Sequence, residues 1–227
     1  MICMHAWSVA AWLTATLGCA GSQAGAFPDV PSAPNSEATT VHAAEDESMR
    51  HNHTGGRLFE QGNLEGAARE FREAIRLSPR NPTPHNNLGM ILHVLGQPAD
   101  ALAEFREAVR LSPAFAPAWS NLGFAFFELD QLAPAIEAWR IAVDLNQQMA
   151  GTWAGLALGL FAIGAINSAI ESYRRALQLD QRYADLTYLQ TVRHWSARVL
   201  DHADTILRVI AARQQVARPS SLMNSPG

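Results

Sequence analysis

The chain has 227 residues, 48% of them hydrophobic, and a formal net charge of −4. This length suits one repeat array with flanking segments, and the negative charge gives no electrostatic footprint for nucleic acid, so we expect no nucleic-acid partner. Both cysteines, Cys3 and Cys19, lie in the first twenty residues, which excludes a disulfide, a thiolate metal site and a cysteine nucleophile from the rest of the chain.

Residues 1–28 contain no Asp, Glu, Lys or Arg, and an apolar run extends from Ala6 to Ala20. Small residues follow it, so residues 1–26 are predicted to be a secretory signal peptide cut after Ala26. Two alternatives stay open: a lipoprotein signal in which Cys19 is acylated, and an uncleaved membrane anchor, for which the run is marginally short. Each version exports the repeats, either to the periplasm or to a membrane-anchored position facing away from the cytosol. Membrane contact is expected through the N-terminus only.

Residues 27–47 are rich in Pro, Ser, Ala and acidic residues. Such a segment buries too little apolar area to order itself, and we predict a disordered linker.

From residue 48 onward, one pattern returns every 34 residues. Gly62, Gly96, Asp130 and Gly164 share one register position. Three more positions repeat in the same way: Ala67, Ala101, Ala135 and Ala169; Phe71, Phe105, Trp139 and Tyr173; Ala74, Ala108, Ala142 and Ala176. A fixed period of this length predicts stacked units, over residues 48–81, 82–115, 116–149 and 150–183, each with a face that it cannot bury alone.

The repeated residues resemble the tetratricopeptide repeat. Unit two carries the motif as Leu88, Gly89, Leu92, Gly96, Ala101, Phe105, Ala108 and Pro113, and unit three carries Trp119, Leu122, Gly123, Phe126, Ala135, Trp139 and Ala142. The resemblance implies an all-α fold, a right-handed α-solenoid of helix-turn-helix repeats. Unit one departs from it with His51 and Thr54 in place of an aromatic residue and Leu, and units three and four close with Gln147 and Gln181 instead of Pro.

The period ends after Tyr183. Residues 184–215 are predicted to form helices that cap the open apolar end of the stack, and residues 216–227 a disordered tail. Within the cap, residues 194–207 resemble the tail of some repeat proteins from photosynthetic bacteria.

The sequence contains no recognisable catalytic or metal-binding pattern. His51 and His53 are two residues apart and would point to different sides of a helix. The imidazoles of His42, His85 and His93 lack carboxylate or cysteine partners at metal-site spacing. We therefore predict a non-enzymatic protein without a metal site or a cofactor.

The resemblance places a partner-binding groove on the concave face, which the first helix of each unit lines. The predicted groove residues are Asn86, Asn87, Met90, Asn121, Phe124, Phe127, Leu158 and Phe161. Asn87 and Asn121 share a register position, and an amide that both donates and accepts can hold a peptide backbone of any sequence. This pair is similar to the asparagine ladder in the repeats of O-linked sugar transferases. The alternative is that both residues only cap or pack.

The groove becomes apolar toward unit four through Phe124, Phe127, Leu158 and Phe161. An exposed apolar patch usually marks a binding site, here for an amphipathic helix or an extended apolar peptide. The alternative is that the C-terminal helices fold back and cover the patch.

These observations predict a non-enzymatic protein–protein interaction scaffold that is exported from the cytosol and binds a peptide or helix of a partner protein. One alternative is a membrane-tethered lipoprotein that assembles an envelope, pilus or photosynthetic membrane complex. Another is the regulatory arm of a transferase.

Overall fold

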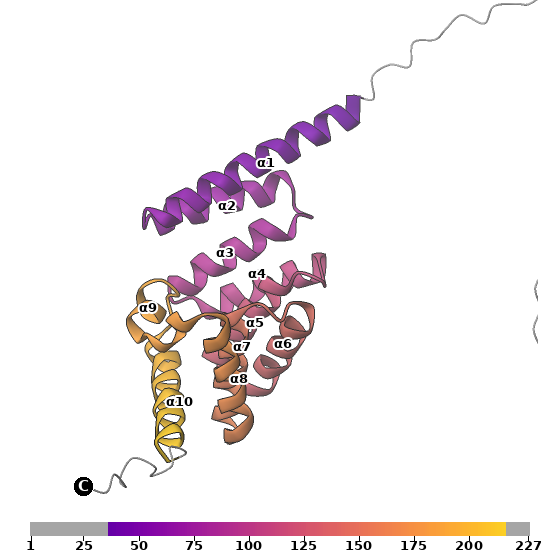
Figure 1. Cartoon of the computed structure of the whole chain (residues 1–227). Helices are drawn as coiled ribbons and strands as arrows, with labels where there is room; N and C mark the ends of the chain where they lie inside the picture. The colour runs from indigo at the N-terminus through magenta and orange to yellow at the C-terminus, as the bar shows by residue number, and fades with distance from the viewer. Residues whose placement is uncertain (1–35, 217–227) are drawn as a thin grey trace, which may run out of the picture. The chain divides into compact units, whose positions relative to one another are not determined.

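The computed structural model describes residues 36–216. Within this range the regular secondary structure is helical and no strand occurs. The fold is an all-α solenoid of helix pairs, in which each pair is one unit with a first helix, A, and a second helix, B (Figure 1). The pairs are α1 (Ser36–Glu60) with α2 (Leu64–Leu77), α3 (Pro82–Val94) with α4 (Pro98–Leu111), α5 (Ala116–Glu128) with α6 (Leu132–Leu145), and α7 (Ala150–Ala162) with α8 (Ile166–Leu179).

The stacking follows the 34-residue period of the sequence. Helices α3, α5 and α7 begin at Pro82, Ala116 and Ala150, the first residues of predicted units two, three and four. Each B helix packs against the A helix of the next unit, and the A helices of successive units also contact one another, α3 with α5 and α5 with α7. The A helices therefore share one face of the stack, which we call the A-helix face.

The turn between the helices of a unit explains one repeated residue. Gly62, Gly96 and Gly164 have φ angles of 76°, 72° and 81°. This left-handed backbone conformation is easily adopted by glycine, and Asp and Asn tolerate it better than most other residues. Asp130, the exception in the sequence repeat, takes the same conformation with φ of 60°.

A buried aromatic residue of each B helix holds the unit together. In unit three Trp139 lies so close to α5 that a Cβ added to Gly123 would come within 2.5 Å of its Nε1 atom. The indole is fully buried, and its Nε1 donates a hydrogen bond of 3.0 Å to the Ser120 carbonyl oxygen. Trp139 also contacts Gly155 of the next unit, so one side chain connects units three and four.

Helix α1 begins earlier than the sequence analysis predicts. It starts at Ser36, so the prediction of a disordered linker over residues 27–47 is wrong for residues 36–47. Alanine and glutamate in this stretch favour a helix. The buried Ser48 hydroxyl donates a hydrogen bond of 2.8 Å to the Ala74 carbonyl oxygen of α2 and anchors α1 just beyond it. The predicted cleavage site, Cys19 and residues 27–35 lie outside the described residues.

The chain after unit four contains a 3₁₀ turn η1 (Gln181–Ala184), a short helix α9 (Leu186–Thr191) and a longer helix α10 (Ala197–Val216). Helix α10 packs on both helices of unit four. Its buried side chains repeat at helical spacing: Val199, Ala203, Ile206 and Ile210. Of the predicted C-terminal tail only Val216 is described, as the last residue of α10.

Candidate functional site

The predicted groove residues all lie on A helices. Helix α3 carries Asn86, Asn87 and Met90, helix α5 carries Asn121, Phe124 and Phe127, and helix α7 carries Leu158 and Phe161. The A-helix face divides into two parts, because the chain's own C-terminal segment lies against one of them.

The apolar part of the face is covered by α10 and the residues that precede it. Phe127 and Leu158 have no exposed surface, and Phe124 is 8% exposed. The Trp195 ring lies 5.6 Å from the Phe124 ring, and the His202 ring lies 5.4 Å from the Phe127 ring (centroid to centroid). The prediction of an exposed apolar groove at Phe124, Phe127 and Leu158 is therefore wrong. The apolar side of α10 covers this patch, because burying both surfaces together removes more apolar area from water.

Polar contacts to unit three fix the start of α10. Ser196 Oγ donates a hydrogen bond of 2.5 Å to Glu128 Oε1 and accepts one of 3.3 Å from the Val199 amide. Arg198 forms an ion pair with Asp130, and its guanidinium lies 5.1 Å from the centre of the Phe127 ring. Asp130 is the residue that replaces the turn glycine, and its carboxylate pairs with α10.

The polar part of the A-helix face carries a continuous row of four asparagine side chains. Asn121 Nδ2 donates to Asn86 Oδ1 at 2.9 Å, Asn86 Nδ2 to Asn87 Oδ1 at 3.3 Å, and Asn87 Nδ2 to Asn52 Oδ1 at 3.0 Å. We call these four residues the amide line. It joins α1, α3 and α5, whereas the sequence analysis paired only Asn87 with Asn121. Asn52 was missed, although it occupies the same register position in unit one as the predicted Asn86 does in unit two.

The side chains of the amide line have donors and acceptors beyond those used in the bonds that join them. A carboxamide has two N–H donors and two acceptor lone pairs. Asn52, Asn87 and Asn121 are half-buried and remain accessible from the face, whereas Asn86 is 5% exposed and bridges between its neighbours. Met90 beside them is 36% exposed. This part of the face therefore offers both donors and acceptors to a backbone laid across it.

Histidine–glutamate pairs join the A and B helices in units one and two. His85 Nδ1 lies 2.8 Å from Glu104 Oε2, and its Nε2 lies 3.2 Å from the Pro79 carbonyl oxygen. Burial lowers the pKa of His85, but the hydrogen bonds to Glu104 and Pro79, two acceptors, outweigh burial and raise that pKa above its ordinary value. In unit one, His51 Nδ1 lies 2.7 Å from Glu70 Oε2 in the same register.

The described residues also bear on metal binding and on membrane crossing. Between residues 36 and 216 no three His, Cys, Asp or Glu side chains are grouped in a way that would hold a metal ion. In the same range no helix combines the length and the apolar character that crossing a bilayer requires.

Comparisons with known proteins agree with the repeat. A family model described as "TPR repeat" matches residues 55–96, and one described as "Tetratricopeptide repeat" matches residues 82–115. No curated protein sequence matches the chain.

Several solved structures have a similar fold. MamA from Desulfovibrio magneticus RS-1 is 21% identical, with a TM-score of 0.55 over 74% of this chain and 97% of that one. PilF of Pseudomonas aeruginosa is 18% identical, with a TM-score of 0.59 over 75% and 78% of the two chains. The first repeat domain of Spaghetti, bound to an HSP90 peptide, is 22% identical, with a TM-score of 0.52 over 53% and 95%. The two family models and the repeated helix pairs identify the chain as a tetratricopeptide repeat protein.

Proposed function

We propose that this protein is a non-enzymatic interaction scaffold that binds an extended peptide segment of a partner protein along the amide line. The observation that carries the proposal is the row of four joined asparagine side chains from three A helices. Side-chain amides pair with peptide groups whatever the peptide sequence. The repeat domain of Spaghetti, which has a similar fold, was solved with a peptide bound, and this supports a peptide as the ligand class.

The dimensions of the amide line set the length of the peptide. Packed helices lie about 8–10 Å apart, so three A helices in a row span about 16–20 Å. An extended chain advances about 3.3 Å per residue, which gives a segment of about five or six residues. A contact of this size has micromolar affinity, about −8 kcal/mol.

The partner meets the polar part of the A-helix face, not the apolar part that the sequence analysis favoured. Phe127 and Leu158 are buried by α10, so they contribute to the site only through the frame that they stabilise. The partner is therefore a peptide held mainly by its backbone, and the amphipathic helix expected for an apolar groove does not fit this face.

We also propose that the protein works outside the cytosol, because residues 1–28 carry an apolar run without charged side chains. A membrane-tethered assembly lipoprotein is the second candidate, supported by Cys19 within that run. Mass spectrometry of the mature N-terminus separates the two. A free amine on Phe27 indicates a cleaved signal peptide and removes the lipoprotein, and an acylated Cys19 establishes the lipoprotein. An intact Met1 in a cytosolic fraction contradicts export.

Peptide binding is tested with a displayed library of random hexapeptides. The wild type is compared with Asn87→Ala/Asn121→Ala, and Asn167→Ala serves as the matched control because Asn167 lies on α8 and bonds Arg213. Losing two or more hydrogen bonds of about 0.5–1.5 kcal/mol each weakens the selected peptides about tenfold or more. The control keeps wild-type affinity, and thermal melting verifies that all variants fold. Equal affinity of the double variant and the wild type would contradict the proposal.

A further inference from the structure

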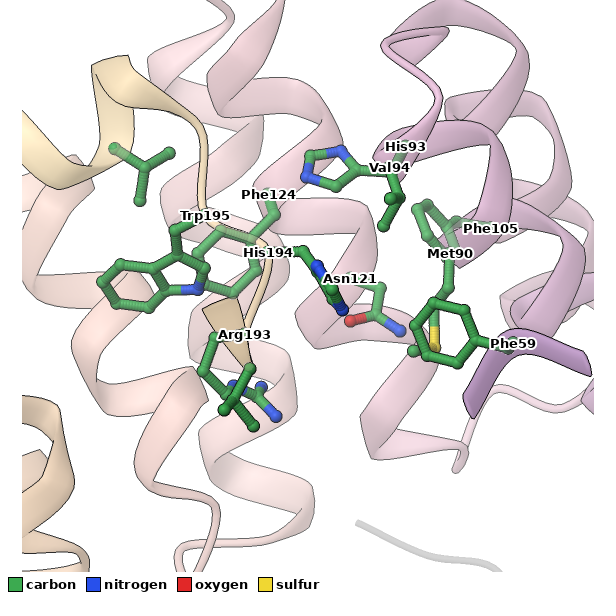
Figure 2. Close-up of a pocket in the computed structure, with 12 residues that line it drawn as sticks. Phe59, Met90, His93, Val94, Phe105, Asn121, Phe124, Arg193, His194 and Trp195 are labelled. Atoms are coloured by element: carbon green, nitrogen blue, oxygen red, sulfur yellow. The ribbon is translucent and has the colours of Figure 1, made fainter. Parts of the chain in front are cut away.

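A cavity of about 230 Å³ lies where the amide line ends. Its walls come from three A helices, from Phe105 of α4, from residues 192–195 and from Val199 of α10 (Figure 2). Residues 192–196 lead from α9 back to α10, and we call them the return segment. Phe59 of α1, Met90 of α3 and Phe124 of α5 face the cavity from the repeats, and His194 and Trp195 face it from the return segment. The repeats alone do not make this cavity, because the return segment supplies one wall.

The cavity wall is built largely of rings. The Phe59 and His194 rings lie 5.5 Å apart, and the Phe124 and Trp195 rings lie 5.6 Å apart (centroid to centroid), both in tilted arrangements. Aromatic rings favour such tilted or edge-to-face neighbours at about 4.5–7 Å. A further flat ring entering this space would find ring faces and edges on several sides.

The charge state of the wall favours a neutral occupant. Burial lowers the pKa of His93, which lines the cavity, so its imidazole is neutral near pH 7. The charged Arg193 is exposed at the edge. An apolar group is therefore accepted inside, and charges of the same ligand remain at the rim.

The backbone of the return segment is held in an unusual conformation at the cavity. His194 has φ of 55°, in the left-handed region that a residue with a side chain rarely adopts. Such a conformation persists where surrounding contacts fix it, and it is frequent at ligand sites. Here it places the imidazole over the Phe59 ring of α1, 135 residues earlier in the chain.

Asn121 is shared by the amide line and the cavity, because it is the last residue of the amide line and also lines the cavity. A peptide bonded along the line therefore delivers one of its side chains to the cavity. We infer that the cavity is an anchor pocket for one aromatic side chain of the bound peptide; this rests on the proposed function. The size fits, because engineered apolar cavities of about 150 Å³ bind benzene.

The first test uses N-acetyl-L-tryptophan amide as the probe, followed by amide-resolved NMR of the full chain. We expect saturable shifts at the side-chain amide of Asn121 and at the backbone of His194. N-acetyl-L-alanine amide at the same concentrations should leave them in place. The same weak shifts with both probes, or none with either, would overturn the pocket.

The second test uses the hexapeptide library with a variant that fills the cavity, Met90→Trp. Its matched control is Met49→Trp on α1, since Met49 is 64% exposed and does not line the cavity. We expect peptides selected on the wild type to share an aromatic residue at one position. Met90→Trp should weaken them at least tenfold and Met49→Trp should not.

The two proposals fail in different ways. If selected peptides lose affinity with Asn87→Ala/Asn121→Ala but tolerate Met90→Trp and show no aromatic preference, the amide line binds and the pocket is wrong. If no peptide is selected, or selection is indifferent to the asparagine substitutions, the proposed function fails and the pocket as a peptide anchor fails with it.

Discussion

The two halves of the solenoid use the same backbone register for different chemistry. In units one and two the A and B helices are joined by His51–Glu70 and His85–Glu104. In units three and four tryptophan occupies the histidine register, and Trp119 Nε1 donates to the Pro113 carbonyl oxygen at 2.8 Å. His85 Nε2 lies 3.2 Å from the Pro79 carbonyl oxygen, which occupies the same repeat position as Pro113, at the end of the preceding unit. Both ring types therefore satisfy the same backbone acceptor.

The partner position changes together with the ring. Glu70 and Glu104 give way to the small buried residues Ala138 and Ser172 in units three and four. A carboxylate at this contact needs a donor, which the imidazole provides with its second nitrogen, whereas an indole has only one N–H. Both residues of this contact therefore change together between the halves, and only the N-terminal half carries titratable groups at it.

The halves also differ on the A-helix face. Units one and two, together with Asn121 at the start of unit three, present the amide line, and α10 covers Phe127 and Leu158 farther along units three and four. The first part of the face is therefore accessible, while the second part uses its apolar surface for the stability of the chain.

The largest effect is expected in the C-terminal half, from Trp139→Ala. Removing this fully buried indole leaves a cavity between units three and four and lowers the free energy of unfolding by about 3–5 kcal/mol. Urea unfolding measures the loss. Trp119→Ala is the control, because Trp119 is only partly buried and should lose clearly less. Equal losses would show that the two tryptophans are equally important and that the junction at Trp139 is not special.

The next largest effect on stability is expected in α10, which covers the apolar part of the A-helix face. Ile206→Ala removes a fully buried side chain of α10 and should destabilise by about 2–4 kcal/mol. Hydrogen exchange should then quicken in α7, α8 and α10 and stay unchanged in α1–α4, because α10 packs on unit four. Val192→Ala, at a 58% exposed position, is the control and should leave exchange as it is. Faster exchange throughout the chain would contradict a division into halves.

A smaller change in the free energy of unfolding is expected when the pH is varied, and it arises in the N-terminal half. Burial lowers the pKa of His85, but Glu104, the Pro79 carbonyl and Glu107 together raise it above its ordinary 6.5. A raised folded-state pKa gives stability that is complete below about pH 6.5 and is lost as the pH rises through the raised value. A hydrogen bond to a charged group is worth about 1.5–3 kcal/mol. Because this pair is partly exposed, we expect the loss to be smaller than the full value of such a bond.

The pH effect is isolated by copying the pair of unit three into unit two, as His85→Trp/Glu104→Ala. Urea unfolding at about pH 6 and about pH 9 should show a smaller difference for this variant than for the wild type. His53→Ala, which removes an exposed histidine of α1, should keep the wild-type difference. If the double variant retains the full pH dependence, His85 is not its source.

The smallest effect is expected where the repeat glycine is missing. Asp130→Gly removes the strain of an aspartate in the left-handed conformation, which stabilises the fold by about 1 kcal/mol. The same change removes the exposed ion pair with Arg198, which costs up to about 1 kcal/mol. The two changes nearly cancel, so the melting temperature should hardly move. Gly96→Asp in unit two introduces the same strain without an arginine at that turn and should lower it. Equal shifts in both variants would mean that Arg198 gives Asp130 no advantage.

The repeat could be predicted from the residues alone: the helix pairs, their period, the turns and the aromatic residue of each B helix. These features depend on residues close together in the chain, and they can be recognised because one pattern occurs four times. The sequence also placed Asn86, Asn87, Met90 and Asn121 on the A-helix face, but it did not predict the hydrogen bonds that join the asparagines or the contribution of Asn52.

The segment that covers the A-helix face became known only from the folded chain. Ser196 bonds Glu128 and Arg198 bonds Asp130, in both cases 68 residues apart in the chain. Hydrophobic periodicity assigns an apolar side to α10 and an apolar patch to α5 and α7, but it does not state that each is the other's partner. That choice depends on the path of the chain after unit four, because burial is non-directional and any matching apolar surface within reach would satisfy it.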